Sequence, residues 1–288
     1  MIAVLKNEIR SYFTNMAAYV IGAFLLFFAG IYTMVYNLNY AVANYELVLS
    51  GMSFIFLVIV PILTMRVIAE ERHQKTDQLL YSLPLSMGKI ILGKYLAMLC
   101  IFLIPIAVIC IYPIILSAFG NVSFPVAYTA ILGFFLLGAS LIAIGTFVSS
   151  VTESQAVAAG LCFVVMLLNY FLSSLSSFVS SSAISSVAAL TICILLLSIV
   201  FYLLTKNSWV STGIGVILEV ITLIVYVADS SMLDGLFGTI MEELSLFEQF
   251  QVFVDGILDL TGVVYFLSVI VFFLFLSVQS MEKRRWGE

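Results

Sequence analysis

The sequence predicts an all-α polytopic membrane protein with about eight transmembrane helices. Two observations lead to this prediction. Of the 288 residues, 63% are hydrophobic and only 9% are charged, whereas a soluble domain carries about 25% charged residues. The apolar residues also gather in long runs, several of them near the roughly 20 residues that a helix needs to cross about 30 Å of hydrocarbon. A single soluble core could not bury so much apolar surface.

Eight apolar runs are candidate spans. The third run contains Pro105 and Pro113, and because proline removes a helical hydrogen bond, we expect this helix to be kinked or broken in two. A serine-rich stretch, SSLSSFVSSSAISS, blurs the ends of the fifth and sixth runs. The expected spans are residues 16–36, 48–68, 88–116, 127–149, 155–172, 187–204, 209–228 and 260–280.

Residues 1–15 precede the first span and are predicted to form a short interfacial helix. They lack the continuous apolar core of a signal peptide. The apolar residues Ile2, Leu5 and Ile9 lie on one helical face, and basic residues lie on another. Such a helix lies along a membrane surface.

The basic residues orient the spans. With eight spans both termini lie on the same side, and all 11 Lys and Arg residues fall on that side or within a helical turn or two of it. The positive-inside rule makes this side cytoplasmic. We therefore expect a bacterial cytoplasmic membrane protein with both termini, including the tail 281–288, in the cytoplasm.

Residues 229–259 form the longest expected segment on the extracytoplasmic side. Apolar residues repeat there at helical spacing, and Ser245 with Glu248 matches a capping box. The pattern predicts two extracytoplasmic amphipathic helices with a break near Ser245. The alternative is an ordinary surface loop.

The sequence lacks the motifs of an enzyme. It contains no phosphate-binding G-x-x-x-x-G-K-[ST] motif, its lone histidine is His73, and its four cysteines all lie in apolar runs without metal-site spacing. We expect no catalytic residue, no metal site and no cofactor bound by this chain.

Glu219 is an ionisable residue deep inside an apolar run. A charged carboxylate at the middle of a bilayer costs about 2.5–3.5 kcal/mol on insertion scales. It therefore marks a possible intramembrane polar site, for which two roles are open. Glu219 either contacts a proton or substrate, or is a protonated structural group bonded to a neighbouring helix.

The charged stretch AEERHQKTDQLLYSLPLS begins at residue 69 and lies between the second and third spans. We expect segment 69–87 to be a helical extension, a turn, and a short amphipathic helix that Pro84 ends. Such a helix is suited to docking in a groove of a soluble partner, although a solvated hairpin is the alternative. The residues expected to make the contact are Glu70, Glu71, Arg72, Thr76, Leu79, Leu80 and Leu83.

Three stretches carry a family resemblance. EERHQKTDQLLYSLPLS followed by GKYLA resembles the coupling segment of type-2 ABC exporter permeases, and NEIRSYFTNMAAYV is similar to their N-terminal interfacial helix. The closing stretch LSLFEQFQVFVDGILDLTGVVYFLSVIVFFLFLSVQSMEKRRW resembles gliding-motility-type permeases. The resemblance covers roughly residues 5–170 and 240–286. Permeases of that type usually have six spans, and this chain carries two more at about 187–228.

The resemblance implies a function and a set of partners. Residues 1–288 would form a single transmembrane permease domain that moves an unidentified substrate, with segment 69–87 against an ABC ATP-binding subunit. That subunit would bind ATP and Mg, and a second permease subunit, identical or homologous, would complete the complex. A companion with an extracytoplasmic domain and the lipid bilayer are further expected partners; nucleic acid is not. The alternatives are ATP-driven mechanotransmission without transport and a stand-alone ion-coupled transporter.

Overall fold

The computed structural model describes residues 1–40, 42–73, 86–176, 183–205, 208–228 and 234–285. Every regular element within these ranges is a helix, which confirms the all-α prediction. The chain divides into two compact units. The first contains Met1–Leu168 and Gln249–Glu288, and the second contains Asn169–Glu248.

Among the described residues, six helices are long and apolar enough to cross a membrane. Two more helices, α11 (Ala183–Thr205) and α12 (Ser208–Ala228), cover the ranges in which further spans are expected and pack against each other. A multi-pass membrane protein follows, while the count of eight spans stays a prediction. The six candidate spans are Ala17–Asn39, Glu46–His73, Met87–Leu116, Phe124–Val151, Gln155–Ser176 and Leu260–Lys283.

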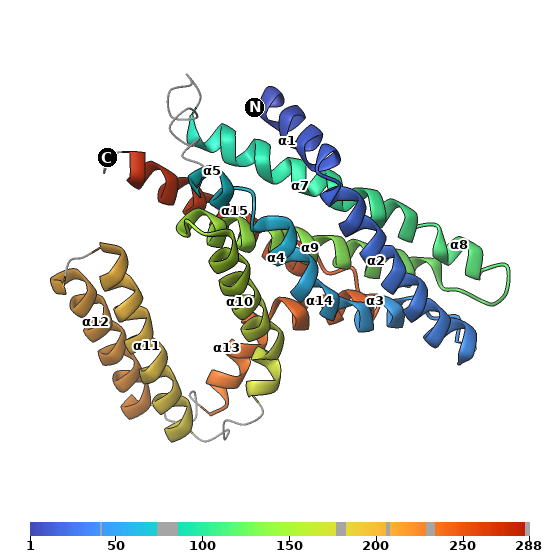
Figure 1. Cartoon of the computed structure of the whole chain (residues 1–288). Helices are drawn as coiled ribbons and strands as arrows, with labels where there is room; N and C mark the ends of the chain where they lie inside the picture. The colour runs from blue at the N-terminus through green and yellow to red at the C-terminus, as the bar shows by residue number, and fades with distance from the viewer. Residues whose placement is uncertain (41, 74–85, 177–182, 206–207, 229–233, 286–288) are drawn as a thin grey trace. The chain divides into compact units, whose positions relative to one another are not determined.

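The N-terminal residues form α1 (Ile2–Thr14), so these residues are helical as predicted, while their location at a membrane surface stays a prediction. Helix α1 packs mainly against α7 and also contacts the start of α2 (Figure 1). Its Tyr12 is buried, and its basic residues Lys6 and Arg10 are exposed. The face of α1 that lies against the rest of unit 1 carries Val4, Glu8 and Tyr12, whereas Ile2 of the predicted apolar face is exposed.

The first two candidate spans are each built from several helical pieces. In the first, α2 (Ala17–Thr33) continues as a π-helix, η1 (Met34–Asn39). In the second, most residues are buried, and a turn separates its last two pieces. These pieces are α3 (Glu46–Met52), the 3₁₀ turn η2 (Ser53–Ile55), α4 (Phe56–Thr64) and α5 (Ala69–His73).

The third candidate span is broken in two, as its prolines predicted. Helix α7 (Met87–Ile109) runs through Pro105, and α8 (Tyr112–Leu116) begins after a short turn. Pro113 lies in the first turn of α8, where its missing N–H leaves no helical hydrogen bond unmade. The break therefore falls just before Pro113 and not at Pro105.

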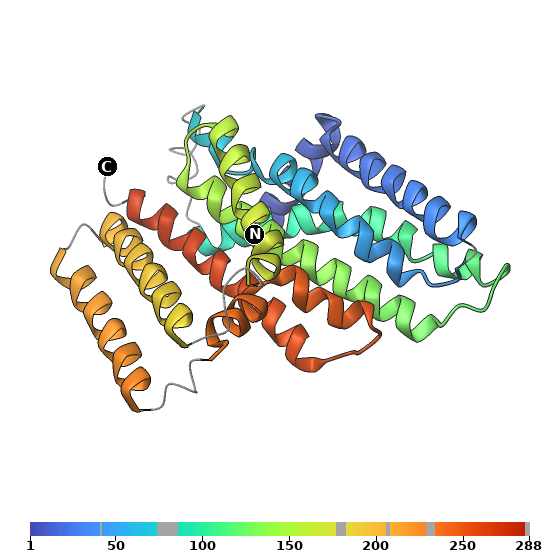
Figure 2. The same ribbon diagram turned by 90° about the horizontal axis from the view of Figure 1, so that it is seen from below.

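Helix α9 (Phe124–Val151) is the most buried of the candidate spans. It packs along α15 (Leu260–Arg285), which returns from the far end of the sequence (Figures 1 and 2). Glycines on α9 allow bulky side chains to lie against its backbone: Phe253 covers Gly133, and Phe102 covers Gly138. Glycine therefore sets the close packing of α9 with its neighbours. Helix α10 (Gln155–Ser176) follows α9.

The predicted break near Ser245 is confirmed. It separates α13 (Leu236–Leu244) from α14 (Leu246–Val254). The Ser245 hydroxyl oxygen accepts a hydrogen bond from the backbone N–H of Glu248 at 3.2 Å, which is the N-terminal half of a capping box. The location of these helices outside the cell stays a prediction.

Candidate functional site

A buried cluster of three charged side chains lies beside the turn that precedes α5, near the end of the second candidate span. The Nζ atom of Lys94, on α7, lies 2.6 Å from Glu8 Oε1 of α1 and 2.6 Å from Glu71 Oε1 of α5. It also donates to the carbonyl oxygen of Val67 at 2.9 Å. Only 2% of the Lys94 side chain is exposed, and these three contacts use all three ammonium donors. We call Glu8, Glu71 and Lys94 the Lys94 cluster.

The Lys94 cluster joins three elements that are far apart in the sequence. A buried ammonium must be paired and hydrogen-bonded, because its desolvation is otherwise costly. Two carboxylates and one ammonium leave one formal negative charge, and the Glu8 and Glu71 side chains are partly exposed, at 17% and 24%. The cluster therefore holds α1, α5 and α7 together through charge.

Gly93 brings α1 close enough to α7 for this contact. A Cβ atom at Gly93 would lie 3.2 Å from Val4 Cγ1 and 3.3 Å from the Met1 carbonyl oxygen, tighter than ordinary van der Waals contact. The absence of a side chain lets the two helices cross beside Lys94. Gly93 thus lets α1 approach α7 closely, and the adjacent Lys94 forms the ion pairs with Glu8 and Glu71.

Arg72 fixes α5 from another direction. The residue is 6% exposed. Its Nη1 donates to the Thr152 carbonyl oxygen, at 3.3 Å, just after α9, and its Nη2 lies 3.6 Å from the Met281 sulfur on α15. The guanidinium group therefore connects α5 to the ends of two further helices.

Two more hydrogen bonds hold the backbone that leads into α5. The Ser149 hydroxyl oxygen accepts from the backbone N–H groups of Ile68 and Ala69, both at 3.2 Å, and so satisfies donors at the start of a helix. The Tyr12 hydroxyl donates to the Leu63 carbonyl oxygen at 3.0 Å. Burial and the nearby Glu8 carboxylate raise the pKa of Tyr12, so this donor stays protonated.

The predicted contact residues divide into two groups. Glu71 and Arg72 have the partners described above within the chain, and Glu70 is half-buried beside a cavity of about 40 Å³ that Tyr12 and Arg66 also line. Glu71 and Arg72 therefore help to position the base of segment 69–87. The remaining four lie outside the described residues: Thr76, Leu79, Leu80 and Leu83.

The sequence reasoning missed the roles of Lys94 and Glu8. Lys94 counted as one of the basic residues that orient the spans, and both Lys94 and Glu8 lie in stretches that carry the family resemblance, but neither was expected to form an ion pair. A signal was nevertheless present, because Lys94 lies inside the long apolar run that begins near residue 88. Charged residues inside such runs usually pair with one another or with backbone carbonyls.

Glu219 lies in unit 2, at the contact between α12 and α11. Its Oε1 lies 2.9 Å from the Thr191 hydroxyl oxygen, which is also 2.9 Å from the Val187 carbonyl oxygen. The Thr191 hydroxyl thus joins Glu219 of α12 to the backbone of the adjacent helix α11, and the functional role of Glu219 stays open.

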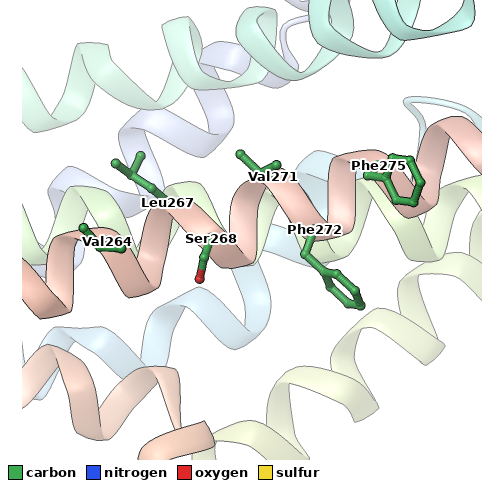
Figure 3. Close-up of a pocket in the computed structure, with 6 residues that line it drawn as sticks. All are labelled: Val264, Leu267, Ser268, Val271, Phe272 and Phe275. Carbon is green, nitrogen blue, oxygen red and sulfur yellow. The ribbon is translucent and has the colours of Figure 1, made fainter.

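A larger cavity, of about 560 Å³, lies along one exposed face of α15 (Figure 3). Its one polar side chain is Ser268, whose hydroxyl donates to the Tyr265 carbonyl oxygen at 2.7 Å. An apolar face of this kind suits acyl chains and offers no group for chemistry. Within the described part of the chain, no three His, Cys, Asp or Glu residues lie close enough to hold a metal ion. The cavity is lined by Val264, Leu267, Ser268, Val271, Phe272 and Phe275.

Comparison with known families assigns a family to the part of the chain that contains the Lys94 cluster. A scan against protein-family models matches residues 2–179, more than half of the chain, to the family described as ABC-2 family transporter protein. The chain belongs to this family. The matched region contains the whole Lys94 cluster and segment 69–87, and it ends before α11 begins. Searches of curated proteins and of solved structures find no match.

Membership in the ABC-2 family fixes the general role of the chain. It is a multi-pass membrane transport permease and is not itself catalytic. Its family implies that it works with an ABC ATP-binding subunit. The narrower resemblance to gliding-motility-type permeases stays a prediction.

Proposed function

We propose that this chain is the permease subunit of a bacterial ABC transporter that moves a substrate across the cytoplasmic membrane. A separate subunit binds and hydrolyses ATP with Mg²⁺. In this proposal eight spans place both termini in the cytoplasm, because the complete Lys and Arg bias requires it. A second permease subunit, identical or homologous, completes the pathway, and a companion with an extracytoplasmic domain is a further partner.

The ATPase contacts segment 69–87 on the cytoplasmic side. Leu79, Leu80 and Leu83 fill a groove of the ATPase, since one apolar stripe on a short helix is suited to such docking. The segment begins at α5, which Glu71, Arg72 and Ser149 fix to the rest of unit 1. A displacement that reaches α5 is therefore transmitted to the membrane helices of unit 1.

The Lys94 cluster is the observation that carries this proposal. The buried ammonium group of Lys94 on α7 pairs with one carboxylate from α1 and one from α5. Breaking a buried ion pair by removing one partner costs about 3–5 kcal/mol. The three helices consequently move as one body when the ATPase displaces segment 69–87, and the stroke reaches both the interfacial helix and the third span.

Mechanotransmission without transport is the second candidate function. In this case the ATPase drives the same helices, and α13 and α14 form the docking surface for an extracytoplasmic partner. The fully buried Phe250 and Phe253 of α14 favour it, because Phe253 packs over Gly133 of α9 and ties α14 rigidly to a central helix. A stand-alone ion-coupled transporter has less support, since Glu219 has no relay of buried charges beside it in the sequence.

Replacement of the apolar stripe tests the ATPase contact. The variant Leu80→Ala with Leu83→Ala should lose its ATPase on copurification or uncouple ATP hydrolysis, because truncating a buried interface residue commonly costs more than about 2 kcal/mol. Charge reversal at the exposed Glu243 of α13 is the control and should leave ATPase binding unchanged. Normal copurification of the double variant with coupled hydrolysis would contradict the docking model. ATP hydrolysis that a substrate stimulates would favour transport over mechanotransmission.

A further inference from the structure

The chain bends sharply between α1 and the first candidate span. Met16 joins α1 to α2 and has a φ of 57°, in the left-handed region that residues other than glycine rarely adopt. Across this bend the rings of Phe13 and Tyr19 pack edge to face, with their centroids 5.3 Å apart. Helix α1 is therefore turned away from the direction of α2 and packs against α7 (Figures 1 and 2).

An apolar strip runs along α1 beside the face that packs against the rest of unit 1. Its first residue is exposed and the other three are half-buried. Phe13 contacts Tyr19 in the first turn of α2, where Tyr19 is 61% exposed, and tyrosine is enriched where spans enter the membrane. The strip therefore lies at the level at which the first candidate span enters the membrane. It consists of Ile2, Leu5, Ile9 and Phe13.

Two basic side chains border this apolar strip. Lys6 and Arg10 are exposed and stand four positions apart on α1, so they share one edge of the helix, with Cβ atoms about 5–6 Å apart. The one acidic residue of α1, Glu8, lies on the opposite side of the helix and pairs with Lys94. Within the described part of the chain, neither Lys6 nor Arg10 forms an ion pair. This edge of α1 therefore presents two accessible positive charges next to apolar side chains.

We propose that α1 binds the headgroup of an anionic phospholipid. Lys6 and Arg10 donate to its phosphate oxygens, and its acyl chains pack against the apolar strip. A lipid fits both features, because a soluble anion would not use the strip and a lipid without net charge would not use both charges. The positive-inside rule requires basic residues near the first span, but it does not require them on one edge of a helix. This site does not depend on the proposed ATPase contact.

Lipid binding to the full chain tests the site. The chain is purified in the neutral detergent dodecyl maltoside, and tritiated phosphatidylglycerol is the probe, at increasing mole fraction in the micelle. We expect saturable binding that unlabelled phosphatidylglycerol displaces. Phosphatidylcholine and glycerol phosphate should not displace it, because the first has no net charge and the second has no acyl chains. Absence of saturable binding, or equal displacement by either of these two competitors, would overturn the assignment.

Matched variants locate the bound lipid. Lys6→Gln with Arg10→Gln should weaken phosphatidylglycerol binding about thirtyfold, since each basic residue near an anionic surface contributes about fivefold. Lys6→Arg with Arg10→Lys keeps both charges and should retain binding. Arg66→Gln with Lys89→Gln removes two other exposed basic residues of unit 1 and should also retain it. Equal losses in the two Gln pairs would indicate general attraction to positive charge, and normal binding by the first pair would place the lipid elsewhere; either result would overturn the proposal.

Discussion

Lys94 and Glu219 are both ionisable residues inside apolar helices, and their surroundings differ. Lys94 meets two opposite charges, from α1 and α5, and a carbonyl oxygen from the turn before α5. Glu219 meets one neutral hydroxyl, Thr191, on the adjacent helix. The first arrangement connects distant parts of unit 1, whereas the second joins two neighbours in a hairpin. The number of partners and their charge thus distinguish a residue that connects several helices from one that joins two neighbouring helices.

Lys94→Met should give the largest effect, because it removes the charge and leaves two carboxylates facing each other. We expect a loss of about 3 kcal/mol in folding stability, the lower end for a buried pair, since Glu8 and Glu71 are partly exposed. Thermal unfolding of the purified chain measures it. Lys89→Met, at an exposed lysine of the same helix, should change stability by less than about 0.5 kcal/mol. Equal losses of folding stability in the two variants would show that the Lys94 cluster does not stabilise the fold.

Glu71→Gln should have an intermediate effect, because the Lys94–Glu8 pair survives while the charge on α5 is lost. We expect a loss of about 1–2 kcal/mol and a lower ratio of transport to ATP hydrolysis with the ATPase still bound. Thermal unfolding and a coupled transport assay in proteoliposomes give the two quantities. Glu8→Gln is the matched variant. A double-mutant cycle of Glu8→Gln and Glu71→Gln measures the coupling free energy between the two carboxylates through Lys94. Strict additivity would argue against a shared cluster.

Gly93→Ala should have a smaller effect, because its new Cβ meets α1 at 3.2–3.3 Å and the neighbours must shift by a few tenths of an ångström. We expect a loss of about 1 kcal/mol. Gly88→Ala on the same helix meets no atom within 4 Å and should instead stabilise by about 0.5–1 kcal/mol. Unfolding midpoints that move in the same direction for both variants would refute the close approach of α1 at Gly93.

Glu219→Gln should have the smallest effect. Glutamine can still hydrogen-bond to Thr191, so we expect a stability change within about 0.5 kcal/mol and nearly normal assembly and transport. Copurification and a transport assay give the answer. A fully assembled but inactive Gln variant would show that Glu219 contacts a proton or substrate, and the comparison with Lys94 would then separate two functional sites.

Local signals allowed part of the fold to be predicted. The amphipathic pattern of residues 1–15, the break before Pro113 and the cap at Ser245 each depend on neighbouring residues, and the structure contains all three. Helix α7 nevertheless runs through Pro105, because buried packing can hold a helix around a single missing hydrogen bond.

The candidate site could be predicted only in part, because its partners are far apart in the sequence. Lys94 pairs with residues 86 and 23 positions away, and nothing in a single sequence specifies that α1 crosses α7. Glu71 and Arg72 were expected to meet a partner subunit through charge pairs. The structure gives both of them contacts within the chain, since a turn brings α5 back against unit 1.

The glycines of α9 have a consequence for how such a protein can evolve. Phe253, Phe102 and Thr64 each lie against one of the glycines Gly133, Gly138 and Gly145, and all of these residues belong to unit 1. A larger residue at any of these glycines would collide with the side chain that lies against it. Selection should therefore act on each glycine together with its covering residue.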